Sequence, residues 1–525
     1  MRLYCLVIRE RKKTIMSKIL KLKIEEGEYW YGGLIDDTQY MPFSKSSNVR
    51  LDMIDNYSYN QNNPMLISSN GRYVYAEEFF ILEVADGVMT IESPADMDFG
   101  QKESFRAAYA YLKDTYFPFD GRYPLENLFT KPQYCTWMAL GEKLTQESVL
   151  AFADSLLKAG LPAGELIFDD GWTDYVGQFE FAVSKFPNPK AMCDRLKEMG
   201  FLLSVWITPY VSSDSSTFRD LLKKGYLVKK NGEPFIAHWW QGYSACIDFT
   251  NPAAREWVAG RVKSLQDRYG IVGVKMDGGD ARIYESGLET YGKEGATANG
   301  LAEAYGRFAA NYAVSEIRST AKCGGLPIMQ RIADRYHTWS DAKNGFDGIV
   351  KKALIMSISG YPYNCPDMVG GGQYEDIDNQ LSEDEELNIR YMEAATFMPS
   401  IQFSKRLWEQ TEKTKSVVLN MLSLRAQYAD YILKLVKNCA KTGEPIIRSM
   451  LYAYGVLPAT SEQFMLGEDL LVAPVISKGA RKKTVWLPKG VWKYEPTGEI
   501  FTGEQTLEVD APLETLPYFS RYEED

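Results

Sequence analysis

The sequence predicts an α/β protein: a (β/α)8 TIM barrel with an N-terminal β-sandwich and a C-terminal all-β domain. In the middle of the chain, helical segments that end at glycine alternate with short apolar strands, which indicates parallel βα units. Their number suits an eightfold barrel. On either side, short strand-like segments are separated by Gly, Asn and Pro, as is typical of antiparallel sheets.

Residues 1–125 are predicted to form the N-terminal β-sandwich domain. The stretches "KILKLKIEEGEYWYGGLI" and "RYVYAEEFFILEVADGVMTIES" have the pattern of strands joined by turns. The opening "MRLYCLVIRERKKTIM" lacks an apolar core of signal-peptide length, and Met16 is a second candidate for the start of the protein.

Residues 126–428 are predicted to form the barrel. The stretch 145–160 has apolar side chains near helical spacing and stops at Gly160, and the apolar strand of "GELIFDDGW" follows. The same order recurs where "NPKAMCDRLKEMG" precedes "FLLSVWITPYV", and where "NPAAREWVAGRVKSLQDRYG" precedes "IVGVKMDGG". Residues 429–525 return to strands such as "KKTVWLP" and "GVWKYEP", and are predicted to form a C-terminal β-sandwich domain.

Charge and composition argue against several classes of partner and site. The net charge of −11 comes from 59 basic and 70 acidic residues without a basic block, so we expect no nucleic-acid binding. No apolar run reaches membrane-spanning length, so we expect no membrane insertion. Seven scattered cysteines without a CxxC pair suggest free thiols, and hence a cytoplasmic protein. With only His238 and His337 available, we expect neither a Ser-His-Asp triad nor a histidine-rich metal site.

Acidic residues follow the predicted strands at the end where a barrel carries its active site. Asp169 and Asp170 follow one strand, Asp277 and Asp334 follow two others, and Asp367 lies in "YPYNCPDMVGGG". Tryptophans accompany them: Trp137, Trp172, Trp206, Trp239, Trp240 and Trp339. Carboxylates and indoles with almost no histidine favour glycoside chemistry, which needs two carboxylates. Any one of these acids alone is more often a helix N-cap, and the tryptophans could be core; the conjunction of several acids at successive strand ends favours a site.

The motif order "FDDGW … VKMDGGD … YPYNCPDMVGG … LGEDLLVAPV … VWLPKGVW" resembles family 31 of the glycoside hydrolases. Within that family, the chain looks closest to the branch of the myogenesis-regulating glycosidase and related α-galactosidases. The similarity extends over roughly 130–520. It implies a retaining, exo-acting α-glycosidase that needs no metal or organic cofactor, with an oligosaccharide or glycoside as substrate.

The resemblance also assigns the two catalytic residues. The nucleophile is Asp277, with Lys275 beside it in the "K.D" motif, and Gly278 and Gly279 behind it would let the backbone pass close to a sugar. The general acid/base is Asp334, which lies sixteen residues after Arg318 and five before Trp339. Asp341 in "WSDA" is a rival that we reject, because its spacing to Arg318 does not match. The usual "GD" of the family is "AD" here.

Several further residues are expected to bind the substrate. By the resemblance, Asp169 and Asp170 hold hydroxyls of the terminal sugar, which favours an α-galactoside. The other expected pocket residues are Trp137, Trp206, Trp240, Lys275, Arg318, Trp339 and Asp367. His238 is either at the pocket rim or an ordinary surface histidine.

Alternative functions stay open at this point. An α-glucosidase or α-xylosidase of the same family fits the same motifs, and sequence does not separate a hydrolase from a transglycosidase. A non-catalytic sugar-binding relative would be expected to have lost one of the two catalytic aspartates, and both are present. The oligomeric state is open, with a homo-oligomer as one possibility.

Overall fold

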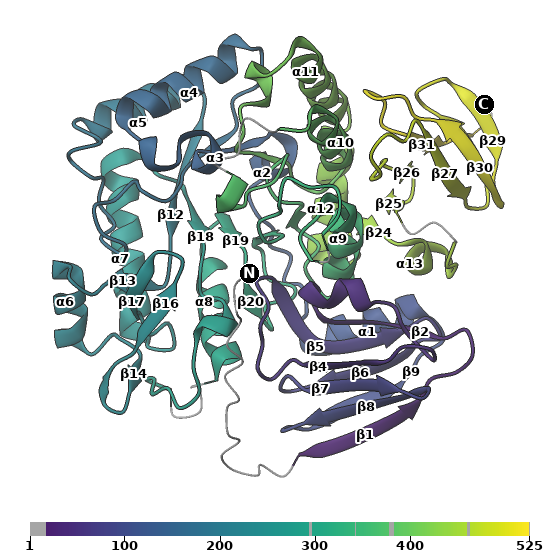
Figure 1. The fold of residues 1–525 in the computed structure, drawn as a ribbon, viewed down its shortest axis with the longest axis horizontal. Helices are drawn as coiled ribbons and strands as arrows, with labels where there is room; N and C mark the ends of the chain where they lie inside the picture. Colours follow the sequence, from purple (N-terminus) through teal and green to yellow (C-terminus); the bar gives the residue numbers. More distant parts are fainter. Residues whose placement is uncertain (1–16, 293–296, 342, 377–382, 459–461, 524–525) are drawn as a thin grey trace, which may run out of the picture.

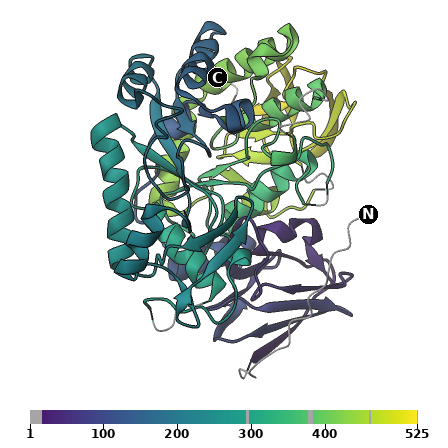
Figure 2. The same ribbon diagram turned by 60° about the vertical axis from the view of Figure 1, so that its left-hand side comes forward.

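The computed structural model describes residues 17–292, 297–341, 343–376, 383–458 and 462–523. A barrel of strands and helices forms the centre (Figure 1). The N-terminal sheets lie below one end of it, and the C-terminal sheets lie at its side; a view turned by 60° keeps this arrangement (Figure 2). The predicted fold class is confirmed.

Eight parallel strands form the barrel and are neighbours in chain order. The sheet closes through a parallel bridge between Met368 and Gln402, which joins the last two strands. The strands are β10 (Gln133–Cys135), β11 (Glu165–Phe168), β12 (Leu202–Ile207), β18 (Gly273–Met276), β19 (Val314–Ile317), β21 (Met329–Arg331), β22 (Asn364–Cys365) and β23 (Gln402–Phe403).

Helices follow most of these strands, and their ends carry the expected caps. The side chain of Thr145 accepts from Ser148 in a capping box at the start of α4, and Gly270 ends α7 in the left-handed conformation. The helices are α4 (Gln146–Lys158), α5 (Pro189–Glu198), α7 (Pro252–Tyr269), α8 (Ala298–Ala309), α9 (Ile349–Ile358), α10 (Glu385–Thr396), α11 (Glu412–Gln427) and α12 (Ala429–Thr442).

Two connections depart from a regular βα repeat. Residues 318–328 contain no helix; they form β20 (Thr320–Ala321), which pairs with a strand of the N-terminal domain. The long connection from β12 to β18 holds β13 (Tyr210–Ser212), α6 (Ser216–Lys224), β14 (Lys229–Lys230), β15 (Glu233–Pro234), and the hairpin of β16 (Ile236–Trp239) and β17 (Gly242–Cys246).

The N-terminal region forms two antiparallel sheets followed by helix α1 (Phe105–Tyr116). One sheet consists of β1 (Lys18–Lys23), β8 (Val88–Ser93), β7 (Ile81–Ala85) and β4 (Val49–Asp52). The other consists of β3 (Phe43–Ser44), β2 (Tyr29–Leu34), β5 (Gln61–Ser68), β6 (Arg72–Ala76) and β9 (Met97–Gln101), with β20 paired to β5. The N-terminal domain therefore shares a sheet with the barrel's own loop.

The C-terminal region is all β after the short helix α13 (Met450–Tyr454). Its larger sheet consists of β24 (Ile447–Arg448), β25 (Phe464–Leu466), β26 (Leu470–Val472), β31 (Tyr518–Arg521), β28 (Val491–Tyr494) and β29 (Glu499–Thr502); β27 (Lys482–Leu487) pairs with β30 (Gln505–Asp510). Buried Arg390 of α10 donates to the carbonyl oxygens of Ala480 and Ala511, which ties this region to the barrel.

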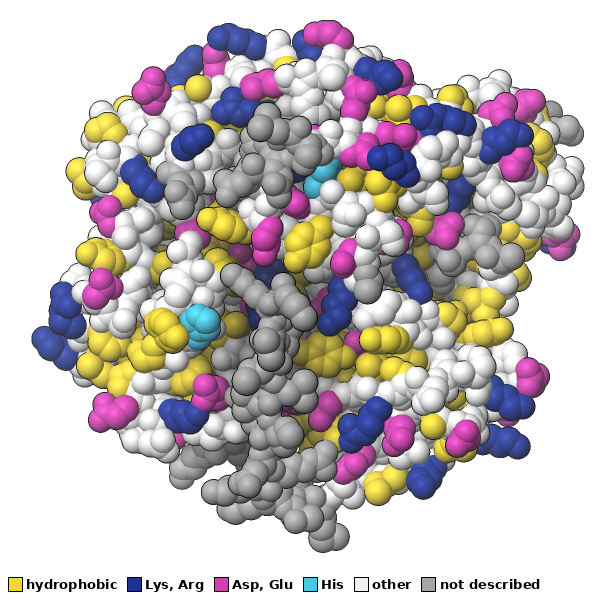
Figure 3. Space-filling model, in the orientation of Figure 1, with side chains coloured by type: hydrophobic (Ala, Val, Ile, Leu, Met, Phe, Trp, Pro, Cys, Tyr) yellow, Lys and Arg dark blue, Asp and Glu magenta, His cyan; other side chains and the backbone are white. Residues whose placement is uncertain are grey.

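The surface is mixed in charge, and acidic and basic side chains are interspersed over the face in Figure 3. No helix among the described residues is long and apolar enough to cross a membrane. The six described cysteines are all buried and unpaired, at positions 135, 193, 246, 323, 365 and 439.

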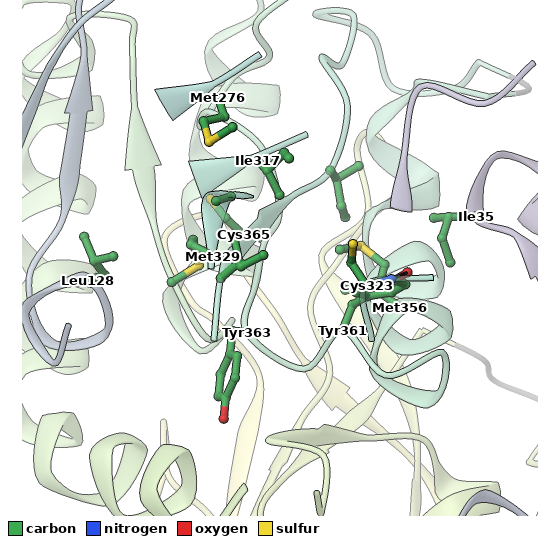
Figure 4. Close-up of a cluster of buried hydrophobic side chains, with 14 of the residues drawn as sticks. Ile35, Leu128, Met276, Ile317, Cys323, Met329, Met356, Tyr361, Tyr363 and Cys365 are labelled. Carbon is green, nitrogen blue, oxygen red and sulfur yellow. Dashed lines mark hydrogen bonds between the residues drawn. The ribbon is translucent and has the colours of Figure 1, made fainter. Parts of the chain in front are cut away.

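One hydrophobic core joins the barrel to the N-terminal domain. Figure 4 shows Ile35, from the N-terminal region, on the same side as Met356 and Tyr361 of the barrel. The 3-10 helix η1 (Ile35–Tyr40) packs against α9, and there buried Lys352 donates to Asp36 at 3.1 Å. Two charges buried at this interface must compensate each other, because an unpaired buried charge is strongly unfavourable.

We expect Lys352→Ala to destabilise the protein by about 3–5 kcal/mol, because it breaks the buried ion pair between Lys352 and Asp36. Urea unfolding followed by circular dichroism measures the change. The matched control is Lys351→Ala, since Lys351 is the neighbouring residue and is only partly buried. Equal stabilities of the two variants would contradict this account of the interface.

Candidate functional site

Asp277 directly follows β18 and is held at both carboxylate oxygens. Its Oδ1 accepts from Arg318 Nε at 2.8 Å and from the Gly278 amide at 2.9 Å, and its Oδ2 accepts from Trp206 Nε1 at 3.1 Å. The Asp277 amide donates to the Ile207 carbonyl oxygen at 2.9 Å, which fixes the backbone at the end of the strand. The carboxylate therefore has a defined orientation, with 13% of its side chain exposed.

Electrostatics keep Asp277 ionised. Burial by itself would raise the pKa of this carboxyl, but the charges of Arg318, Arg331 and Lys275, together with the hydrogen bond from Arg318, lower its pKa well below the usual range. A carboxylate in this state is available as a nucleophile at neutral pH.

The two glycines after Asp277 have a structural reason that differs from the predicted one. Both have positive φ, 67° for Gly278 and 70° for Gly279. A Cβ on Gly278 would lie 2.8 Å from the Tyr210 ring, and a Cβ on Gly279 would lie 2.6 Å from the Tyr305 ring. Close packing against two buried tyrosines and the left-handed turn thus require glycine, without reference to a sugar.

This turn brings a second acid, Asp280, onto the same arginine. Asp280 is fully buried, and its two oxygens accept from Arg318 Nη1 and Nη2 at 2.9 and 3.0 Å. Arg318 Nη1 also donates to the carbonyl oxygen of Tyr59, in the N-terminal domain, at 3.2 Å. The sequence analysis missed Asp280; the only sequence sign was the second acid of "DGGD".

Asp334 belongs to a second cluster, centred on Arg331. Nη1 of Arg331 donates to Asp334 Oδ1 and to Asp367 Oδ1, each at 2.6 Å, and its Nε donates to Glu316 Oε1 at 2.9 Å. Asp367 is fully buried, and its Oδ2 accepts from the Arg335 amide at 2.8 Å. Asp334 is the most open of these acids, with 31% of its side chain exposed. Arg331 was also missed from the sequence.

The two arginines lie side by side, because Arg318 and Arg331 each come directly after the pairing of Ile317 with Gln330 in the adjacent strands β19 and β21. The charge of Arg331 contributes to lowering the pKa of Asp277. In return, although burial alone would lower the pKa of Arg318, the charges of Asp280, Asp277 and Asp334 raise it. Asp277 and Asp334 thus both face the pair formed by Arg318 and Arg331.

Asp169 and Asp170 differ in environment although they are adjacent. Asp169 is buried; its Oδ2 accepts from Lys275 Nζ at 2.7 Å and from the Cys135 thiol at 2.9 Å, and its Oδ1 accepts from the Asp170 amide at 2.8 Å. Asp170 is partly exposed, and the Gln241 side chain donates to its Oδ2. Burial, then the charge of Asp169, raises the pKa of Asp170 to about 7.

The turn of the β16–β17 hairpin covers this group of acids. The Trp239 ring stacks on Trp206 with centroids 6.4 Å apart, and the Arg318 guanidinium lies 5.5 Å from the Trp240 ring centroid. The Gln241 side chain donates a hydrogen bond to Asp170. Residues 239–241 of the hairpin therefore contact Trp206, Arg318 and Asp170 in turn. Trp240 is 46% exposed and is therefore accessible to a ligand. Gln241 was missed, since its role depends on the fold of the hairpin.

The two other predicted tryptophans, Trp137 and Trp339, make different contacts. Trp137 donates to the Gly372 carbonyl oxygen and packs on Tyr374. Trp339 donates to Asp384 Oδ2 at the start of α10, and its contacts do not include the acids described above.

His238 is exposed and stacks on Tyr243. Asp341 is exposed, and its carboxylate accepts from the amides of Lys343 and Asn344 within its own loop. Within the described ranges, no group of three or more His, Cys, Asp or Glu side chains is placed to hold a metal ion.

Comparison with known proteins identifies relatives. Residues 132–435 match the model of the glycosyl hydrolases family 31 TIM-barrel domain, and residues 443–524 match the family 31 C-terminal domain. The myogenesis-regulating glycosidase of Mus musculus is 31% identical over 425 residues, covering 78% of this chain and 59% of that protein. Alpha-glucosidase 2 of Bacillus thermoamyloliquefaciens is 24% identical over 405 residues, covering 71% of this chain and 50% of the other.

The fold also has solved counterparts. A family 31 alpha-xylosidase from a soil metagenome, complexed with xylose, superposes with a TM-score of 0.81 at 22% identity, covering 98% of this chain and 81% of that one. The present chain spans 59% and 50% of the lengths of the two curated relatives above.

The turn after Asp277 gives a stability prediction. We expect Gly279→Ala to lower the free energy of unfolding by about 1–3 kcal/mol more than Gly287→Ala, because only the former places a Cβ against a buried ring. Gly287 is the matched control, since its φ is 75° and a Cβ there would meet nothing within 4 Å. Thermal or urea unfolding provides the comparison, and equal losses would show that ring packing does not constrain the turn.

Proposed function

Since the chain belongs to family 31 of the glycosyl hydrolases, we propose that it is a retaining, exo-acting α-glycosidase that removes a terminal α-linked hexose from oligosaccharides. The observation that carries this proposal is the arrangement of Asp277 and Asp334 around Arg318 and Arg331. Asp277 is 13% exposed, held in a fixed orientation and kept ionised, which suits a nucleophile, and Asp334 is 31% exposed.

In the first step, Asp277 attacks C1 of the terminal sugar, and the bond from C1 to the leaving oxygen breaks. Asp334 donates its proton to that oxygen. Trp206 and Arg318, which already bond the carboxylate, hold it in the attacking orientation. The product of this step is a glycosyl ester on Asp277.

In the second step, Asp334 takes a proton from water, and the water oxygen attacks C1. The ester bond breaks, and Asp277 returns to its ionised form. The two inversions leave the configuration at C1 unchanged, which requires carboxyl groups about 5–5.5 Å apart.

The terminal sugar is proposed to bind between β11 and the β16–β17 hairpin. Asp170, with one side chain oxygen bonded to Gln241, is suited to a sugar hydroxyl, and Asp169 and Lys275 support it from the barrel interior. The indoles of Trp206 and Trp240 offer faces for the ring. The "DDGW" phrase, similar to one in other α-galactosidase families, favours an α-galactoside. Trp137 is proposed to line the same pocket.

An α-glucosidase or α-xylosidase is the second candidate. Relatives and structural neighbours with those names support it, and the site described here is compatible with either sugar. We further propose a reducing, cytoplasmic location, supported by the six free cysteines.

Two substitutions test the catalytic roles. We expect Asp277→Asn to abolish turnover of an aryl α-glycoside, because the amide is not a nucleophile. Asp334→Ala is expected to slow substrates with poor leaving groups about 10²–10⁴-fold, and activated aryl glycosides less, because only the former need protonation. Steady-state rates on methyl and 4-nitrophenyl α-glycosides measure both effects. Near-normal rates in both variants would rule out this pair of residues.

A substrate panel tests the sugar. We expect 4-nitrophenyl α-galactoside to be cleaved with a higher kcat/KM than the α-glucoside, α-xyloside or α-N-acetylgalactosaminide, because the acids of "DDGW", Asp169 and Asp170, are proposed to hold an axial 4-hydroxyl. Proton NMR of the first product should show the α-anomer. A glucoside or xyloside preference would replace the galactoside assignment, and a β-anomer would overturn the retaining mechanism.

A further inference from the structure

Two carboxylates at the mouth of the barrel share a single guanidinium nitrogen. Asp334 Oδ1 and Asp367 Oδ1 each lie 2.6 Å from Nη1 of Arg331. The two oxygens are therefore at most about 5 Å apart, so each acid feels the other's charge. Glu316 takes the Nε of the same arginine, so Arg331 cannot turn to serve one acid alone.

Asp367 is placed to act through this arginine instead of touching a sugar. Its side chain is 0% exposed, and its second oxygen accepts from the Arg335 amide. Its φ is 75°, a left-handed conformation that is uncommon for residues other than glycine. By contrast, Asp334 is the member of the pair that opens to the pocket.

The charges around this pair are unbalanced. In the direct ion pairs, one guanidinium group, that of Arg331, bonds three carboxyl groups: those of Asp334, Asp367 and Glu316. Burial raises the pKa of Asp367 and the charge of Asp334 raises it further, while Arg331 lowers it; the result is a pKa of about 6. The remaining groups that face the pair are Arg335, Tyr391 and Cys365 on the side of Asp367, and Arg318 and Asp277 on the side of Asp334.

We propose that Asp367 is a positioning residue for the acid/base Asp334. Asp367 shares the guanidinium group of Arg331 with Asp334 and repels the negative charge of Asp334, so that Asp334 keeps the proton that glycoside cleavage consumes. This inference rests on the proposed function. Asp334 alone beside Arg331 would favour the ionised form, which has no proton to donate. The like charge of Asp367 opposes that tendency, as in other pairs of adjacent carboxyl groups.

The pH dependence of kcat/KM for a methyl α-glycoside tests the proposal, because its basic limb reports the acid of the free enzyme. In Asp367→Asn the repulsion is lost, and Nη1 of Arg331 has one carboxylate partner, Asp334, instead of two. The basic limb should move to lower pH by about one unit, which is a tenfold loss of kcat/KM at a given pH on that limb. The loss of kcat/KM should be smaller for the 4-nitrophenyl substrate.

A second variant, Arg331→Lys, keeps the proposal falsifiable if the first does not fold. A lysine lacks the planar fork by which Arg331 reaches Glu316 through Nε and the two aspartates through Nη1, so its hold on Asp334 weakens and the basic limb should move to higher pH. General damage to the fold would not shift the basic limb to lower pH in one variant and to higher pH in the other. Asp248→Asn is the control, since Asp248 is buried and, among the described residues, its carboxylate accepts hydrogen bonds from Thr250 and Tyr291, away from Arg331.

Opposite shifts in the two variants, with an unmoved limb in the control, support the proposal. A limb that stays in place in a folded Asp367→Asn, or that moves to lower pH in Arg331→Lys, overturns it. Failure of the proposed function is distinguishable, because then the wild-type protein would cleave none of the glycosides, or Asp277→Asn would remain active.

Discussion

The site depends on two buried guanidinium groups, those of Arg318 and Arg331, at the carboxyl ends of adjacent strands. A buried carboxylate is stable only next to a compensating charge, and each arginine compensates several. Arg318 joins Asp277 to Asp280, and Arg331 joins Asp334 to Asp367. The rigid fork of arginine sets the orientation of each acid, so the geometry of the site follows from where these two side chains are held.

The N-terminal domain helps to hold them. Gln61 donates to the carbonyl oxygen of Arg331 at 2.7 Å, Asn60 accepts from the Ala333 amide at 2.8 Å, and Tyr59 accepts from Arg318. These three consecutive residues precede or begin β5, which pairs with β20 in the loop that follows Arg318. The helix that a regular βα unit would place between β19 and β21 is thus replaced by contact with another domain. This explains why the core is continuous across that boundary.

Much of the barrel, but less of the site, could be predicted from the sequence. Apolar segments that end in Asp169 or Asp277 are local patterns, and they correctly indicated parallel strands with acids at one edge. The partners of those acids are set by the fold: Gln241 meets Asp170 from 71 positions away, and Gln61 meets Arg331 from 270 positions away. Local spacing carries no signal for such pairs. Local spacing also did not reveal the packing of the glycines after Asp277, because the tyrosine rings that they contact come from other elements.

The most direct test of the account is to find which residue becomes covalently bound during turnover. The enzyme would be treated with 5-fluoro α-glycosyl fluorides of galactose, glucose and xylose, digested with protease, and analysed by tandem mass spectrometry. The account predicts a glycosyl ester on the peptide that contains residue 277, attached to that aspartate. Turnover of these reagents with the label on any other side chain would contradict it.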